Sequence, residues 1–404
     1  MALAKAGGSK VKTMSKLTVL VVGMAVAALT ATLAGSMPPV HSAPVLPQDF
    51  TNSQVVSGLT NPTDMEFAPD GRLFITEDTG RVRIAKPDGT PDGTLATFLN
   101  ISTKVDSKGE RGLLALTFDP GFSTNGYVYL HYTRKATSST PPHNRVVRVT
   151  ASGNKAVAGS EKLIFRLGNQ SAANQFPQFM GGALDFGIDG KLYVATGDND
   201  TPNKAQQLTN LFGKMLRINK SGTIPTDNPF YSTASGNNRA IWALGLRNPF
   251  KFAMQPGTGT IFVNDVGENT WEEINQLEKG ANFGWPHHEG VANDPPSYVD
   301  PIFAYGHDST NTTGCAITGG TFYPPTSTLF PQEYEGDYFF ADFCSGWIRR
   351  LEPTTGGGFA ASGFATGLER PIDLEVSQAG ELYYLARGNM GSPAIVGKIG
   401  YAGT

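Results

Sequence analysis

An acidic stretch in the second half of the chain has the composition of a cation-binding turn. Four carboxylates fall within nine residues and are interrupted by glycine and asparagine: Asp265, Glu268, Glu272 and Glu273. Hard cations such as calcium bind carboxylate, amide and backbone carbonyl oxygens together, and such a turn offers all three. A solvated acidic loop has the same composition, so the spacing alone leaves both interpretations open.

Two residues just upstream are suited to a flat, oxygen-bearing ligand. Arg247 and Asn248 stand where an expected strand begins. A guanidinium stacks on planar rings and also donates hydrogen bonds to oxygens. The structural alternative for Arg247, and for Arg370 nearer the C-terminus, is a salt bridge between neighbouring sheets.

Other common catalytic patterns are missing from the sequence. It has no glycine-rich phosphate loop, no Gly-x-Ser-x-Gly elbow and no His/Cys cluster with zinc spacing. Of its six histidines, His287 and His288 follow Trp285 and a proline, where they could face a funnel as a base or as ligands. The sequence alone therefore identifies no clear general base.

The overall composition is that of an all-β protein without affinity for nucleic acid. The formal net charge is −3 and there is no basic excess, which argues against a nucleic-acid partner. Hydrophobic residues make up 39% of the chain, enough for a sizeable core. The 48 glycines and 27 prolines are expected where many short strands are joined by tight turns.

One pattern occurs six times: a short apolar stretch, a glycine-centred turn and an aromatic-rich strand. The copies begin near Asp64, Leu116, Leu184, Lys251, Thr318 and Asp373. A period of roughly fifty to seventy residues, each unit a run of short strands, predicts a β-propeller. We expect a six-bladed propeller of four-stranded antiparallel sheets over residues 58–404, with a leader over residues 44–57.

The first 43 residues have the order of a secretory signal peptide. Lysines are followed by an apolar run over residues 17–34 and then by small residues. We therefore expect a secreted or periplasmic protein, with an uncleaved anchor as the alternative. No later apolar run is long enough to span a bilayer, so no membrane is expected after the signal is removed.

The two cysteines, Cys315 and Cys344, both lie in the fifth repeat. Exported proteins with an even number of cysteines usually pair them. A disulfide within one blade is therefore predicted, and a catalytic thiol is the alternative.

Several segments together resemble the glucose/sorbosone dehydrogenase family, including its hedgehog-interacting-protein-like branch. They lie at residues 110–116, 181–184, 190–198, 247–249, 265–267, 272–275, 280–286 and 342–346, and so cover nearly the whole mature chain. The resemblance implies an exported six-bladed propeller that uses pyrroloquinoline quinone and calcium to oxidise CH–OH groups of sugars. The partners implied are a small sugar and an external electron acceptor.

The resemblance also implies roles for individual residues. Arg247 and Asn248 would lie against the quinone, and Glu110 and Arg370 would bind it as well. The backbone carbonyls of Gly267 and Glu268 would hold the calcium ion that bridges to the cofactor and polarises it as a Lewis acid. Structural calcium would lie in the region of Glu272 and Glu273.

This chain departs from the family pattern at three positions around the implied cofactor. Phe179 stands where the family has its histidine base, and a phenylalanine cannot accept the proton of a sugar hydroxyl. Cys344 falls near the position of a cofactor lysine, and Ile372 replaces a second cofactor arginine.

Three functional hypotheses follow, because the propeller fold alone does not decide function. The first is a quinone-dependent sugar dehydrogenase with an altered base. The second is a non-catalytic, calcium-containing propeller that binds carbohydrate or a protein partner. The third and weaker one is a lactonase-type hydrolase with calcium in the central channel.

Overall fold

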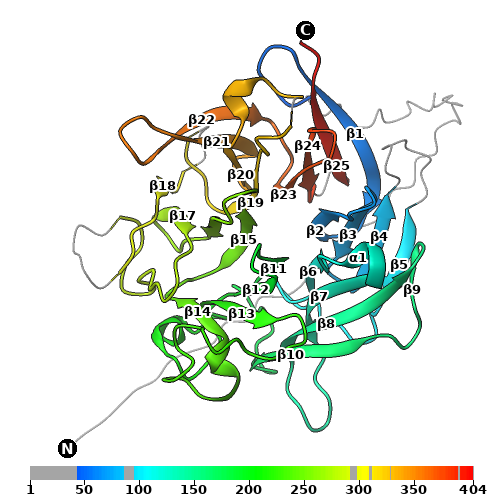
Figure 1. Cartoon of the computed structure of the whole chain (residues 1–404), viewed down its shortest axis with the longest axis vertical. Helices are drawn as coiled ribbons and strands as arrows, with labels where there is room; N and C mark the ends of the chain where they lie inside the picture. Colours follow the sequence, from blue (N-terminus) through cyan, green and yellow to red (C-terminus); the bar gives the residue numbers. More distant parts are fainter. Residues whose placement is uncertain are drawn as a thin grey trace, which may run out of the picture. The chain divides into compact units, whose positions relative to one another are not determined.

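The computed structural model describes residues 43–85, 95–291, 298–308, 312–327, 329–389 and 392–403. In these residues the strands form six antiparallel sheets arranged around a common axis (Figure 1). This confirms the predicted six-bladed propeller. The expected signal peptide over residues 1–43 lies, except for its last residue, outside the described part.

The first three blades contain the following strands in chain order. Blade 1 consists of β2 (Pro62–Phe67), β3 (Leu73–Glu77), β4 (Arg81–Ala85) and β5 (Ala96–Asn100). Blade 2 consists of β6 (Leu113–Phe118), β7 (Tyr127–Arg134), β8 (His143–Ser152) and β10 (Lys162–Asn169), with the short β9 (Lys155–Ala156) paired to β8. Blade 3 consists of β11 (Gly181–Phe186), β12 (Lys191–Thr196), β13 (Lys214–Asn219) and β14 (Ile241–Leu244).

The last three blades follow the same plan. Blade 4 consists of β15 (Pro249–Met254), β16 (Ile261–Asp265), β17 (Trp271–Gln276) and β18 (Phe303–Gly306). Blade 5 consists of β19 (Ile317–Phe322), β20 (Tyr338–Asp342), β21 (Trp347–Pro353) and β22 (Phe359–Thr366). Blade 6 consists of β23 (Pro371–Val376), β24 (Leu382–Ala386), β25 (Ala394–Tyr401) and β1 (Phe50–Leu59).

The helices of the described chain are short and lie between strands. They are α1 (Phe122–Asn125) and the 3-10 turns η1 (Pro202–Gln206), η2 (Gly236–Ala240) and η3 (Gln332–Tyr334). No helix among the described residues is long and apolar enough to cross a membrane.

The propeller is closed by a strand from the opposite end of the chain. β1 pairs antiparallel with β25, with Phe50 opposite Tyr401 and Asn52 opposite Ile399. The segment expected as a leader over residues 44–57 thus contributes most of the outermost strand of blade 6.

The first strand of each blade lies at the axis, and apolar clusters fill the spaces between blades. β2, β6, β11, β15, β19 and β23 contact one another in sequence around the axis. Between blades 1 and 2, the rings of Phe74 and Phe118 meet edge to face at 5.0 Å. Such packing explains why each repeat needs an aromatic-rich second strand, because one sheet alone cannot bury both of its faces.

The predicted disulfide between Cys315 and Cys344 is present, with the two Cα atoms 5.7 Å apart. It joins the segment before β19 to the segment after β20. Both segments belong to blade 5, as the sequence predicted.

Candidate functional site

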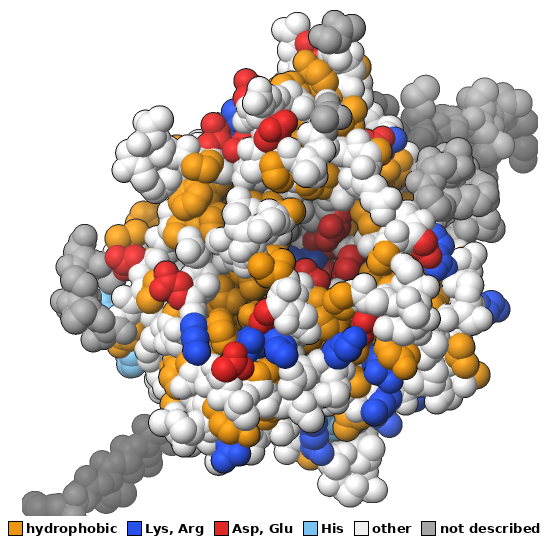
Figure 2. All heavy atoms as spheres, in the orientation of Figure 1, with side chains coloured by type: hydrophobic (Ala, Val, Ile, Leu, Met, Phe, Trp, Pro, Cys, Tyr) orange, Lys and Arg blue, Asp and Glu red, His pale blue; other side chains and the backbone are white. Residues whose placement is uncertain are grey.

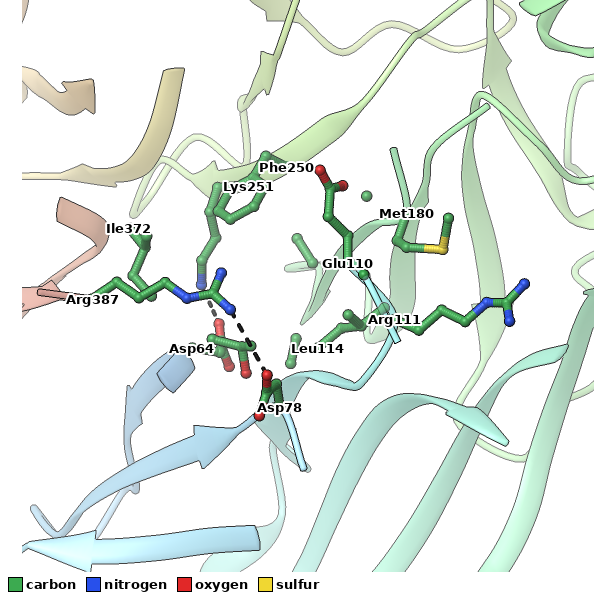
Figure 3. A pocket seen from close by; sticks show the side chains of 16 residues that line it. Asp64, Asp78, Glu110, Arg111, Leu114, Met180, Phe250, Lys251, Ile372 and Arg387 are labelled. Atoms are coloured by element: carbon green, nitrogen blue, oxygen red, sulfur yellow. Dashed lines mark hydrogen bonds and ion pairs between the residues drawn. The ribbon is translucent and has the colours of Figure 1, made fainter. Parts of the chain in front are cut away.

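A recess opens on the propeller axis, and we call it the axial recess. Its lining comes from all but one of the blades and includes Asp64, Asp78, Glu110, residues 180–183, Lys251, Ile372 and Arg387. Figure 3 shows the carboxylate of Glu110 at one side and the guanidinium of Arg387 reaching in from another. Because the inner strands converge here, residues distant in sequence become neighbours.

Lys251 forms the floor of the axial recess. Its ammonium group contacts Asp64 of β2 and donates to Asp373 of β23 at 2.8 Å. Burial opposes the charge on Lys251, but the two carboxylates outweigh this effect and raise its pKa. The trio joins blades 1, 4 and 6 in the interior, where an unpaired charge would be strongly unfavourable.

The turn that contains Phe179 forms one wall of the site. Phe179 has a φ angle of 56°, in the left-handed region that bulky residues rarely adopt. Its backbone N–H donates to Glu110 Oε2 at 2.7 Å, and the N–H of Gly181 donates to Asn248 Oδ1 at 2.8 Å. Two side chains from other segments therefore hold both ends of this turn.

The guanidinium of Arg247 is buried beside the turn at Phe179 and lies near two aromatic rings. It is 3.8 Å from the ring centre of Phe179 and 5.5 Å from that of Trp285. Its Nη1 donates to the carbonyl of Val266 at 3.1 Å and also to that of Gly267. Among the described residues the guanidinium of Arg247 forms no salt bridge, although its charge lowers the pKa of Glu110 and Asp198.

Buried carboxylates position Arg247, Asn248 and Trp285 beside this turn. Asp265 accepts the backbone N–H of Arg247 at 3.0 Å and that of Asn248 at 2.7 Å. Asp198 accepts the indole N–H of Trp285 at 2.8 Å. Burial raises the pKa of Asp198 to about 6, although the hydrogen bond from Trp285 opposes the shift. Asp198 lies in one of the family-like segments, but the sequence analysis assigned no role to it.

Glu110 is the most open carboxylate of the recess. Its side chain is accessible to solvent, yet protein surrounds it on most sides because it stands inside a concave mouth. Burial raises the pKa of Glu110, while the backbone N–H groups of Phe179 and Met180 and the charge of Arg247 lower it. The net shift is upward.

Two arginines of blade 6 contribute positive charge. Arg370 is exposed, and its guanidinium lies 5.4 Å from the ring of Phe343. Arg387 donates its backbone N–H to the carbonyl of Arg370 at 3.0 Å, and its guanidinium lies 3.8 Å from Asp78. Arg387 lines the recess beside Ile372, and the sequence analysis did not single it out. Its position follows from the pairing of β23 with β24, which places Pro371 opposite Ala386.

The two glutamates predicted near structural calcium have hydrogen-bond donors of their own. Glu272 contacts His307 Nε2 at 2.6 Å and accepts the N–H of Ile317 at 2.8 Å. Glu273 accepts the N–H of Gly290 at 2.6 Å and the amide of Asn275 at 3.1 Å. Because they are consecutive on β17, the two side chains point to opposite faces of the blade.

Of the two backbone carbonyls predicted to bind calcium, that of Gly267 already has a donor. The carbonyl of Gly267 accepts a hydrogen bond from Arg247, and the N–H of Glu268 donates to Glu289. In the part of the chain that the structure describes, no group of three or more His, Cys, Asp or Glu side chains is arranged to hold a metal ion. These donors do not fit a calcium ion while Arg247 contacts Gly267, and the calcium sites remain predictions.

The candidate histidine bases lie outside the recess lining. His287 is exposed and His288 is half-buried, and both rings lie beside Tyr298. His131 is fully buried, with Nδ1 2.8 Å from the carbonyl of Gly182. Burial lowers the pKa of His131 to about 4, so it is neutral at physiological pH.

The fold and the axial recess define a six-bladed propeller with a candidate ligand site on its axis. The chain belongs to the glucose/sorbosone dehydrogenase family, whose model matches residues 59–395.

Similar proteins include glucose dehydrogenases and Hedgehog-interacting protein. Quinoprotein glucose dehydrogenase B of Acinetobacter calcoaceticus is 29% identical over 322 residues, or 70% of this chain and 65% of that protein. Human Hedgehog-interacting protein is 31% identical over 239 residues, or 53% of this chain and 33% of that protein. A solved oxidoreductase (glucose dehydrogenase) from Thermus thermophilus has a TM-score of 0.72 at 29% identity, covering 87% of this chain and 99% of that one.

Proposed function

We propose that this chain is an exported dehydrogenase that oxidises CH–OH groups of sugars with pyrroloquinoline quinone bound at the axial recess. Family membership supports the reaction class. The observation that carries the proposal is the placement of cationic and amide groups around the recess: Arg387 lines it, Arg370 adjoins it, and the buried Arg247 and Asn248 contact the turn at Phe179 to Gly181 that forms one of its walls. An external acceptor would take the electrons.

The chemistry of these groups fits a flat quinone that carries carboxylates. Guanidinium groups bind carboxylates through paired hydrogen bonds, so Arg370 and Arg387 would hold the acidic edge. Arg247 and Asn248 would donate to its carbonyl oxygens. When bound, the quinone would supply the two-electron oxidant, and the protein would orient the sugar and accept its proton.

Calcium enters the proposal through the carbonyls of Gly267 and Glu268. Since Arg247 now donates to Gly267, ion binding there requires this guanidinium to turn away. We assign no step of the chemistry to the ion.

The proposal is tested by titrating the purified mature protein with pyrroloquinoline quinone, with and without calcium. Reduction of an electron-accepting dye is then followed with a panel of aldoses. We expect saturable quinone uptake and sugar-dependent dye reduction. Absence of uptake in both conditions would contradict the proposal.

A second candidate is a non-catalytic propeller that binds carbohydrate or a protein partner. It is favoured by Phe179, whose ring covers the guanidinium of Arg247 at 3.8 Å and offers no proton acceptor. Human Hedgehog-interacting protein, a relative that is matched over only a third of its length, is consistent with this use of the fold. This candidate predicts sugar or protein binding by calorimetry without any quinone uptake.

A further inference from the structure

The proposed function leaves one chemical requirement unmet by the predicted residues. A sugar hydroxyl must lose its proton as the adjacent C–H bond is oxidised, and a placed base accelerates this step. The side chain at position 179 cannot serve, because it is a phenylalanine. The acceptor must then be a group that faces the recess and is not already neutralised.

Three carboxylates line the axial recess, and two of them have other partners. Asp64 contacts Lys251 and accepts the backbone N–H of Leu116 at 2.9 Å. Asp78 is buried and faces the guanidinium of Arg387 at 3.8 Å. Glu110 remains, with its carboxylate open to the recess and apart from this charged pair (Figure 3).

We propose that Glu110 is the proton acceptor of this site, an assignment that rests on the proposed function. Its Oε2 accepts the backbone N–H of Phe179 at 2.7 Å, so the carboxylate lies directly beside the chain at position 179. The backbone N–H of Met180 also interacts with this carboxylate, which therefore faces the turn with one side and the recess with the other. The proposed acceptor thus lies on the loop that packs against the turn and not in the turn itself. The backbone N–H of Glu110 fixes this loop by donating to the carbonyl of Pro177 at 2.9 Å.

The charges around Glu110 shift its pKa in both directions. Arg247 lowers its pKa and Asp200 raises it, and Asp78 and Arg387 face it across the recess. Burial is the largest effect and outweighs the groups that lower the pKa, so the pKa of Glu110 is raised above its usual value. A carboxylate whose pKa moves toward the working pH accepts a proton more effectively in the transition state.

In the proposed step, the hydroxyl proton of the sugar passes to the carboxylate of Glu110. The C–H bond breaks as the C=O bond forms, and its electron pair leaves as hydride to the quinone oxidant of the proposed function. Glu110 then releases its proton to solvent through the open mouth of the recess.

Glu110→Gln is the decisive variant, because glutamine keeps an oxygen that can accept the Phe179 N–H. In the quinone-loaded protein we expect kcat to fall by at least about a hundredfold while quinone uptake is retained. The acid limb of the kcat–pH profile should disappear, which a merely structural role would not cause. The matched control is Glu335→Gln, an exposed glutamate outside the recess, which should change nothing.

A second measurement does not depend on turnover. In the unloaded protein with ¹³C-labelled glutamate, several carboxyl signals should titrate above the usual glutamate range, and one of them should be missing in Glu110→Gln. If Glu110→Gln proves unstable, Glu110→Asp is the replacement variant. Aspartate keeps the carboxylate but withdraws it from the substrate, so kcat should fall by less than the loss expected for Glu110→Gln.

The outcomes separate the two proposals. If the wild type turns over and Glu110→Gln loses less than about threefold, the assignment of Glu110 is overturned and the proposed function stands. A Glu110 signal with an ordinary pKa would likewise overturn the assignment. If the wild type takes up no quinone, the proposed function fails and the assignment of Glu110 fails with it.

Discussion

At the scale of single residues, the site is built by side chains that fix a backbone turn. Glu110 and Asn248 hold the two ends of the turn at Phe179 to Gly181, and Asp265 holds Arg247 and Asn248. Each of these is a carboxylate or amide that accepts backbone N–H groups. Such bonds keep a left-handed residue in place that would otherwise relax to a more common conformation.

Phe179→His tests whether the position itself can still support a base. Histidine is one of the side chains that tolerate a positive φ angle, so the turn should be retained. In the Glu110→Gln background, we expect Phe179→His to raise kcat by about a hundredfold, because a placed base is restored. Dye reduction with an aldose at saturating quinone measures the effect.

Phe179→Leu in the same background is the control for this substitution. It also removes the ring from Arg247 but supplies no base. Equal turnover of the two double variants would mean that relief of the stacked ring, and not proton transfer, limits the reaction.

At the scale of structural elements, the sequence predicted what is periodic and missed what depends on long-range pairing. The sequence predicted the turns that follow the inner strands, because a glycine recurs there. In the structure these glycines, Gly71, Gly190 and Gly380, adopt positive φ angles at equivalent places. The role of β1 was not visible, because its partner β25 lies more than three hundred residues away. Arg387 was missed for a different reason: it follows β24 directly, and only the register of β24 against β23 shows that it reaches the recess.

One buried carboxylate organises the end of blade 5. Asp342 accepts the N–H groups of Cys315 and Ala316 at 3.0 and 3.1 Å, and those of Cys344 and Ser345 at 2.9 and 2.7 Å. It also accepts the hydroxyl of Tyr305 at 3.0 Å. The carboxylate therefore ties together the same two segments as the disulfide.

Asp342→Asn should destabilise the propeller even with the disulfide intact. Asparagine has a single acceptor oxygen, so at least two of the buried N–H groups would lose their partner. We expect a loss of about 3 kcal/mol in the free energy of unfolding, measured by chemical denaturation. The variant Glu335→Gln on the surface of the same blade should stay within about 0.5 kcal/mol of the wild type. A similarly small effect of Asp342→Asn would show that the disulfide alone fixes these segments.

At the scale of the whole molecule, the six inner strands bring acidic residues together on the axis. Figure 2 shows acidic side chains within the central hollow of the face in view. Glu66, Asp185 and Glu375 come from blades 1, 3 and 6 and line a second hollow on the axis with Lys251. Thr117 donates to Glu66 at 3.1 Å and to Asp185 at 3.0 Å. The closure of the propeller therefore brings several carboxylates together in one concave space.

This crowding predicts how the stability of the propeller depends on pH. Burial and mutual repulsion raise the pKa of Glu66 and Glu375 well above the usual value, and burial raises that of Asp185 to about 6. A carboxyl with a raised pKa binds more protons in the folded state than in the unfolded state. The contribution of these carboxyls to the free energy of unfolding is therefore greatest near or below pH 4. It is lost as the pH rises through their folded-state pKa values.

Glu375→Gln should remove part of this loss, because it replaces a charge with a neutral group of similar shape. At pH 8 we expect a higher midpoint of thermal unfolding, corresponding to a gain on the order of 1 kcal/mol in the free energy of unfolding. At pH 4.5 we expect little change. Scanning calorimetry of the wild type and the variant across this range measures the difference, with Glu335→Gln as the exposed control. A wild type whose midpoint climbs steadily from pH 5 to pH 8, or a variant that is equally less stable at both pH values, would mean that these carboxylates are ionised and well compensated on the axis.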